Sequence, residues 1–229
     1  MAGLHPLPTS NDPVLLRAGR RGCLLVHGFT GCPWEMRYLG ERLHEADITA
    51  NVVRLAGHGT SEADMEGVAW EDWYGSALAG LDALEEHTDE IVVVGQSMGA
   101  LLALKLAAEN PERVRGLVLL APALVTATSW LPLAAPLIPF VLTAFGDRYR
   151  FVRKEGGSDI ADEAARTAIP SYAATPLRSV VQLVRLQAHA RRLLPQVRQP
   201  TLVIHSSQDH TCPIDNVGIL QRELPGPVR

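Results

Sequence analysis

The sequence predicts an α/β protein with a mostly parallel sheet, and two patterns support this fold class. Short apolar runs alternate with amphipathic stretches along most of the 229 residues, which is the pattern of repeated β-α-β units. In addition, Ser97 lies directly between an apolar, β-branched run and a run of strong helix formers. A strand, a tight turn and a helix are therefore expected to follow one another at Ser97.

Each expected element follows from a local pattern of hydrophobicity. Apolar runs predict buried strands at residues 23–26, 51–55, 91–94, 116–122 and 201–205. Apolar residues at helical spacing predict amphipathic helices over residues 34–46 and 70–87. The helix after Ser97 is expected to end at Asn110, because the next residue is a proline, which disfavours helical backbone before it.

Residues 123–200 are expected to form an insertion over the sheet, a small helical cap, because no strand pattern repeats there. The stretch 130–145 is almost wholly apolar, but it is too short to span a bilayer and contains three prolines. We expect it to be a lid that contacts an apolar ligand or its own core. Residues 147–198 hold ten Lys or Arg against five Asp or Glu. Solvated helix faces explain this excess, and attraction of a carboxylate or an anionic interface is the alternative.

Length and composition limit the function classes. The chain is expected to form a single domain, 1–229. Its formal charge of −4 and pI near 6.1 offer no positive excess for a phosphate backbone, so nucleic acid is not an expected partner. Three scattered cysteines fit neither a disulfide framework nor a zinc site, and they favour a reducing cytoplasm. Residues 1–13 lack the pattern of a secretory signal, and no stable membrane insertion is expected.

Ser97 is the candidate catalytic residue. A Gly-x-Ser-x-Gly turn between a strand and a helix holds the serine oxygen above a parallel sheet, and only small residues such as Gly95 and Gly99 permit so tight a turn. The pattern predicts a nucleophile for acyl transfer, with the N–H of Met98 as one donor to the oxyanion. The alternative is a structural turn in which Ser97 only caps the following helix.

Several motifs together resemble a known family. His-Gly-Phe-Thr-Gly at 27–31, Gly-His-Gly at 57–59, the turn at Ser97, Ala-Pro at 121–122 and Ser-Gln-Asp at 207–209 occur in this order. The chain is similar in these residues to the α/β-hydrolase superfamily, and more narrowly to small bacterial carboxylesterases and monoacylglycerol lipases. This resemblance implies an α/β-hydrolase fold with a small cap, and hydrolysis of short- to medium-chain acyl esters without a metal or cofactor. It also implies that the N–H of Phe29 is the second oxyanion donor.

Asp209 is the candidate acid that orients a catalytic base. It follows the last predicted strand by a short loop and comes after Ser97 in the chain, which is the order this fold requires. The alternative is a turn aspartate that accepts hydrogen bonds from nearby backbone N–H groups.

The catalytic histidine that the resemblance implies should lie further beyond Asp209 than the chain extends. None of the eight histidines is a convincing base: His5, His27, His44, His58, His87, His189, His205 and His210. The sequence therefore predicts a C-terminally truncated fold that lacks the last strand and helix. Such a fold would expose one edge of the sheet, so we expect low stability or a homo-oligomer that covers this edge.

Two functions from different classes remain open at this stage. The first is a serine carboxylesterase or monoacylglycerol lipase that forms an acyl-enzyme on Ser97. The second is a catalytically impaired, hydrolase-like protein that binds a small apolar ligand in the same pocket. Within enzymes, a thioesterase, lactonase, peptidase or cofactor-free haloperoxidase would share the predicted fold.

Overall fold

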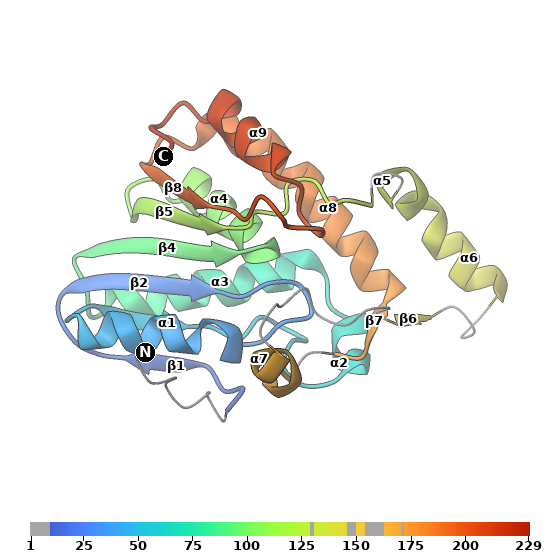
Figure 1. Cartoon of the computed structure of the whole chain (residues 1–229), viewed down its shortest axis with the longest axis horizontal. Helices are drawn as coiled ribbons and strands as arrows, with labels where there is room; N and C mark the ends of the chain where they lie inside the picture. Colours follow the sequence, from blue (N-terminus) through green and yellow to red (C-terminus); the bar gives the residue numbers. More distant parts are fainter. Residues whose placement is uncertain (1–9, 129–130, 146–149, 154–162, 171) are drawn as a thin grey trace.

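The computed structural model describes residues 10–128, 131–145, 150–153, 163–170 and 172–229. Its central sheet has the strand order β1-β3-β2-β4-β5-β8 (Figure 1). These strands are, in the same order, Val14–Leu16, Thr49–Val52, Arg21–Val26, Glu90–Gln96, Val114–Leu120 and Thr201–Ile204. β1 is antiparallel to β3, and every other neighbouring pair in this sheet is parallel. The predicted fold class is confirmed.

Helices cover the two faces of the sheet unequally (Figure 1). α3 (Trp70–Glu85) and α4 (Met98–Glu109) pack against one face, and α8 (Leu177–Leu193) packs against α4. The buried side chains of this face form the larger core cluster, to which Leu24, Val93 and Leu119 belong. α1 (Trp34–Glu45) covers β2 and β3 on the other face, in a smaller cluster. Because successive strand residues point to opposite faces, β2, β4 and β5 contribute to both clusters.

The ends of the predicted elements differ from the observed ones for local reasons. β3 ends at Val52 instead of continuing to Leu55, because the N–H of Leu55 donates to the His27 ring and not to a strand. Outside the predicted insertion, the sequence patterns also missed three short elements. These are β1 and the helices α2 (Glu62–Glu66) and α9 (Asp215–Glu223).

The predicted insertion at 123–200 contains more than helices. Its apolar stretch is divided into α5 (Leu131–Ala134), the 3-10 helix η1 (Ala135–Leu137) and α6 (Ile138–Phe145). A two-stranded antiparallel sheet of β6 (Phe151–Arg153) and β7 (Ala174–Pro176) follows, with α7 (Glu163–Ala168) between its strands. α8 and the 3-10 helix η3 (Leu194–Gln196) then return to the larger core cluster. In the described part of the chain, no helix is both long enough and apolar enough to cross a membrane.

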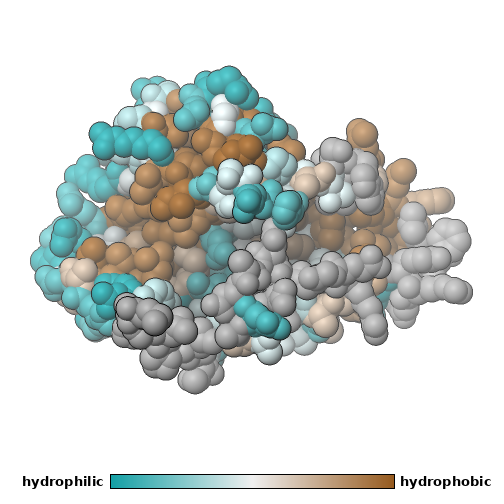
Figure 2. Space-filling model, viewed as in Figure 1, coloured by the Kyte–Doolittle hydropathy of each residue, from teal (hydrophilic) through white to brown (hydrophobic). Residues whose placement is uncertain are grey.

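The sheet face without a covering helix at β5 and β8 is apolar and partly exposed. Leu202 and Ile204 of the edge strand β8 are 43% and 55% exposed. Figure 2 shows apolar residues gathered over this part of the sheet. Residues 227–229 lie beside β8 and pair with it in parallel, through a bridge between Thr201 and Val228.

Candidate active site

Ser97 occupies a strained turn at the carboxyl end of β4. Its φ of 53° lies in the left-handed region, which a residue with a side chain rarely adopts. The turn is held by its own backbone: the N–H of Ser97 donates to the carbonyl of Leu120, and the carbonyl of Ser97 accepts from Ala123. The side chain is partly exposed. A hydroxyl is thus presented at the surface where the strand meets α4.

Two glycines are required by close approach of backbone at this turn. A Cβ atom on Gly95 would lie 2.3 Å from the carbonyl oxygen of Gly99, and one on Gly99 would lie 2.2 Å from the carbonyl oxygen of Val26. Neither contact can be relieved by moving a flexible side chain, since both partners are backbone atoms. The glycines therefore allow β2, β4 and α4 to meet closely enough to raise Ser97.

The His-Gly-Phe-Thr-Gly loop lies against Ser97. A Cβ atom placed on Gly28 would be 3.4 Å from Cβ and 3.9 Å from Oγ of Ser97. The carbonyl oxygen of Gly28 accepts from Nδ1 of His27 at 2.9 Å and from the N–H of Gly31 at 3.2 Å. Because C=O and N–H point in opposite directions across a trans peptide, the N–H of Phe29 points away from these two donors. His27 thus fixes the direction of the Phe29 N–H.

His27 is itself held in one tautomer. Its Nδ1–H donates to Gly28, and its Nε2 accepts from the N–H of Leu55 at 3.2 Å, so both ring nitrogens are used by the neutral form. Burial, helped by the neighbouring His58, lowers the pKa of His27 to about 3. Burial also lowers the pKa of His58 to about 4. Both rings are therefore uncharged at neutral pH.

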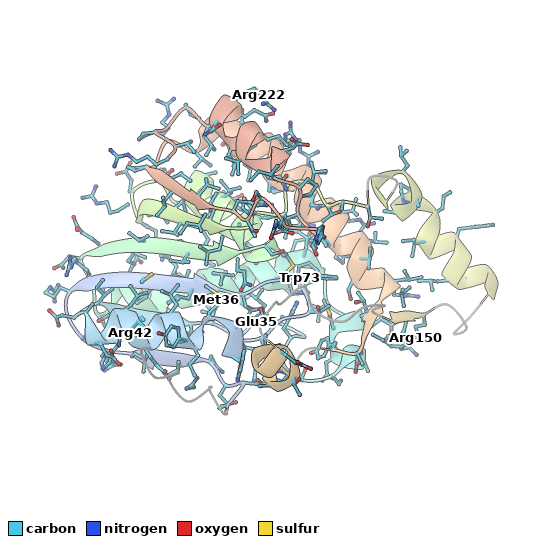
Figure 3. The ribbon with its side chains drawn as sticks, viewed as in Figure 1. Glu35, Met36, Arg42, Trp73, Arg150 and Arg222 are labelled. Carbon is cyan, nitrogen blue, oxygen red and sulfur yellow. The ribbon has the colours of Figure 1, made fainter. Side chains whose placement is uncertain are left out.

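An aromatic cluster supports the loop from below. The ring centroid of Trp73 lies 5.9 Å from that of Phe29 and 5.6 Å from that of His58, and both pairs meet edge to face. Trp73 is fully buried on α3, close to the carboxyl ends of the central strands (Figure 3). This packing holds the backbone of the loop in place through contacts that involve no charge.

Asp209 lies on the loop that follows β8, and its side chain is 15% exposed. Its Oδ1 accepts from the N–H of Thr211 at 2.9 Å and from that of Cys212 at 2.7 Å. Its Oδ2 lies 3.7 Å from Nε2 of His205. One carboxylate oxygen thus makes the backbone bonds of a turn aspartate, while the other faces an imidazole.

Cys212 brings this loop to Ser97. Its Sγ lies 3.9 Å from Oγ of Ser97, although 115 positions separate the two residues. Cys212 is buried, and this burial raises the pKa of its thiol to about 11, so the thiol is neutral and a poor nucleophile at neutral pH. The sequence reasoning missed this contact. Its position three residues after Asp209 was the available signal.

No histidine ring is hydrogen-bonded to Ser97 among the residues that the structure describes. His205 donates from Nε2 to the carbonyl of Cys212 at 2.8 Å, as expected for a hydrogen-bonded residue at the end of a strand. His210 is exposed, and His5 lies outside the described residues. Within the described part, no His, Cys, Asp and Glu side chains form a group that could hold a metal ion.

The chain is similar to known proteins over most of its length. Residues 18–227 match the model of a protein family described as "serine aminopeptidase, S33". A thermostable monoacylglycerol lipase of Bacillus sp. (strain H-257) is 34% identical over 96% of this chain and 83% of its own length. A carboxylesterase of Bacillus subtilis (strain 168) is 24% identical over 93% of this chain and 81% of its own length.

A solved structure shows the same fold. It belongs to a report of two metagenome-derived lipolytic enzymes and superposes with a TM-score of 0.84 at 31% identity, over 96% of this chain and 85% of that one. The chain belongs to the serine aminopeptidase S33 family and has the α/β-hydrolase fold.

Proposed function

We propose that the chain hydrolyses short- to medium-chain acyl esters, including monoacylglycerols, through an acyl-enzyme on Ser97. Its relatives include a lipase and a carboxylesterase, and the chain is a carboxylic ester hydrolase. The observation that carries the serine mechanism is the strained, partly exposed Ser97 with the Gly28 loop against it.

In this mechanism Oγ of Ser97 attacks the ester carbonyl and its proton passes to a base. The N–H groups of Phe29 and Met98 stabilise the oxyanion, and the alcohol leaves as the acyl-enzyme forms. Water then attacks the acyl group and releases the carboxylic acid. Asp209 is the acid that would orient the base, since its Oδ2 faces an imidazole and not a backbone donor.

Turnover by this chain is expected to be slow, because no imidazole reaches Ser97 among the described residues. Oxyanion stabilisation and binding alone can retain about a thousand- to ten-thousandfold acceleration over water. Slow hydrolysis that depends on Ser97 is therefore the expected result.

The test combines labelling with turnover. A fluorophosphonate probe should modify Ser97, and nitrophenyl esters should be cleaved faster than an amino-acid nitroanilide, which an aminopeptidase would prefer. Ser97→Ala should abolish both labelling and ester cleavage. A folded sample that cleaves the nitroanilide and spares the esters would contradict the proposal.

A second candidate is a catalytically impaired protein that binds a small apolar ligand in the same pocket. The neutral thiol of Cys212 beside Ser97 favours it, since a thiol with a pKa of about 11 is already protonated at neutral pH and cannot take the proton of Ser97. Imidazole added to the assay separates the two candidates. If ester cleavage increases with imidazole concentration and depends on Ser97, only the base is missing. If Ser97 stays unlabelled at every concentration, the binding protein is favoured.

The surroundings of the site complete the proposal. We propose that residues 123–200 act as a lid within a single domain, and that the chain works in the cytoplasm, where its three free cysteines stay reduced. A second copy of the chain would cover the apolar face at Leu202 and Ile204. Sedimentation of the wild type and of Ile204→Lys tests this, because the substitution should turn a dimer into a monomer. A monomeric wild type would contradict it.

A further inference from the structure

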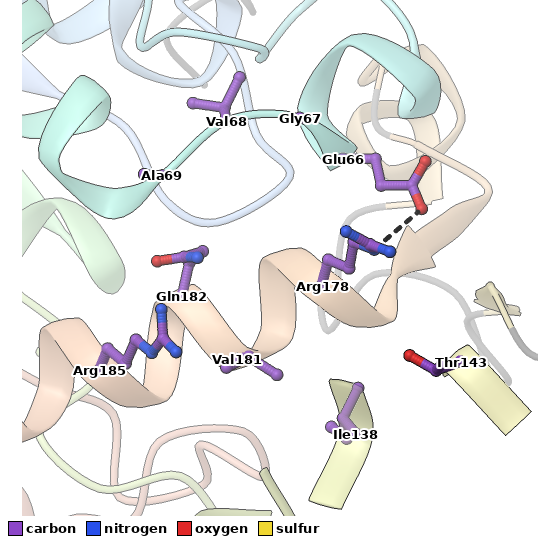
Figure 4. A pocket seen from close by; sticks show the side chains of 10 residues that line it. All are labelled: Glu66, Gly67, Val68, Ala69, Ile138, Thr143, Arg178, Val181, Gln182 and Arg185. Carbon is purple, nitrogen blue, oxygen red and sulfur yellow. Dashed lines mark ion pairs between the residues drawn. The ribbon is translucent and has the colours of Figure 1, made fainter. Parts of the chain in front are cut away.

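A cavity whose lining does not include Ser97 lies between α8, the segment 66–69 and α6. Its volume is about 450 Å³, which lies within the usual range for small-molecule sites. Its lining comes from three parts of the chain (Figure 4). None of the four candidate residues of the active site lines it.

The cavity has a charged side and an apolar side. Arg178, Gln182 and Arg185 line one side, from a single face of α8. Val181 of the same helix and Ile138 of α6 line another part, and Val68 and Ala69 add further apolar surface. A polar end next to an apolar wall suits an amphipathic molecule, which has a polar end and an apolar part.

The charge balance at the polar side is positive. Glu66 is the acidic residue of the lining, and its side chain is only 9% exposed. It forms ion pairs with Arg150 and with Arg178, the second at 3.9 Å, so its charge is already balanced. Arg185 makes no ion pair with any described residue. A guanidinium that faces a cavity without an acidic partner favours an anion there.

Gln182 adds an oriented hydrogen-bond donor beside this arginine. Its Oε1 accepts from the N–H of Trp70 at 3.5 Å, and this bond directs the side-chain oxygen toward α3. The amide NH₂ group is therefore available to donate to a ligand oxygen. Figure 4 shows the ends of the Gln182 and Arg185 side chains close together on the same side of α8.

We propose that this cavity binds the anion of a straight-chain fatty acid. Arg185 and Gln182 hold its carboxylate, and its chain lies against Val181 and Ile138. A planar carboxylate matches the two parallel N–H groups of a guanidinium, and an alkyl chain matches the apolar wall. This inference goes beyond the proposed function and does not require that Ser97 cleaves esters.

The experiment measures binding to the Ser97→Ala protein, so that no acyl-enzyme can form. Dodecanoate, dodecanol and dodecyltrimethylammonium are titrated by calorimetry below the concentrations at which they form micelles. Dodecanoate should bind most tightly, because its chain equals those of the other two and its headgroup alone is an anion. Equal binding of all three compounds would overturn the carboxylate assignment.

Two substitutions then locate the binding site. Arg185→Gln should weaken dodecanoate binding about tenfold to a hundredfold, the loss expected for one charge-assisted hydrogen bond. Arg222→Gln is the matched control, since Arg222 lies on the outer surface of α9, far from Arg150 in Figure 3. If both arginine variants weaken binding equally, the effect is one of general surface charge and the proposal is wrong.

Gly67 offers a second, steric test. Its φ of −82° suits any residue, and a Cβ atom there would meet no atom within 4 Å, so Gly67→Leu should fill part of the cavity without strain. Gly75→Leu is its control, because Gly75 is equally open but lies on α3 outside the lining. Binding should be lost only in Gly67→Leu. If Gly67→Leu binds dodecanoate as tightly as Gly75→Leu, the ligand lies elsewhere.

Discussion

The two loops that flank Ser97 are held in place in different ways. In the loop 27–31, the buried His27 uses both ring nitrogens to fix the peptide between Gly28 and Phe29. In the loop 205–212, His205 uses Nε2, while its buried Nδ1 has no partner among the described residues. In the proposed mechanism, the first loop needs only backbone amides to act. The second would have to bring a proton acceptor to Ser97, and the atom that lies beside Ser97 is a neutral sulfur.

This difference teaches that the two halves of acyl-transfer chemistry make unequal demands on a chain. Oxyanion donors are backbone groups, so local packing is enough to aim them. Proton transfer needs three side chains from different elements in one line. Substitutions in the loop 27–31 should therefore lower turnover by this chain more than substitutions in the loop 205–212.

The largest effect is expected from His27→Ala. Without the Nδ1–H donor, the carbonyl of Gly28 keeps only the longer hydrogen bond from the N–H of Gly31, and the direction of the Phe29 N–H is held less firmly. We expect nitrophenyl ester turnover to fall about a hundredfold, as for the loss of one oxyanion donor, with little change in KM. Fluorophosphonate labelling should slow in parallel. A change confined to KM would show that His27 shapes substrate binding and not the oxyanion site.

A strong pH effect on stability is expected from His27 and the neighbouring His58. His27 and His58 titrate near 6.5 when unfolded but only near 3 and 4 when folded. Between about pH 6 and pH 5 the unfolded state binds both protons and the folded state neither, so the free energy of unfolding falls by up to about 2.7 kcal/mol per pH unit as the pH falls. This stability is fully present above pH 6.5.

Urea unfolding across this pH range measures the effect. His58→Gln should roughly halve the slope with pH, while His44→Gln, which alters an exposed histidine, should leave it unchanged. A slope that stays the same in His58→Gln would show that His58 is already charged in the folded protein.

A smaller effect is expected from Asp209→Asn. Asparagine keeps an oxygen that can accept from Thr211 and Cys212, so the loop should fold as before. An intact triad would lose about ten-thousandfold, but we expect less than about a tenfold loss of turnover here, because no imidazole links Asp209 to Ser97 in the described residues. A loss of turnover near ten-thousandfold would show that a base does link Asp209 to Ser97. The comparison between the loops 27–31 and 205–212 would then be wrong.

The smallest effect is expected from Cys212→Ala. The thiol is buried and its pKa is raised to about 11, so it contributes packing and no charge near Ser97. Turnover should change by no more than about twofold, and iodoacetamide should modify Cys212 slowly at pH 7. Rapid alkylation of Cys212 that also abolishes turnover would contradict a packing role for its thiol. It would show that the loop 205–212 is open to solvent.

Much of the fold could be predicted because the signals are local. The strand before Ser97 and the helix after it are present as β4 and α4, since β-branched residues and helix formers act within a few positions. The prolines of the apolar stretch divide it into α5, η1 and α6, as expected of residues that interrupt helices. β6 and β7 were missed because each is only three residues long and is defined by its partner across the insertion.

The sequence by itself determined the tight turn at Ser97, the glycines that permit it and the order of Ser97 and Asp209. These features depend on backbone conformation and on neighbours in the chain. The tertiary structure alone decided that Cys212 touches Ser97 and that His27 directs the amide of Phe29. It also decided that Arg185 lines a cavity and has no acidic partner among the described residues. Contacts between distant positions depend on how whole elements pack, and the free energy that selects the packing is spread over the entire core.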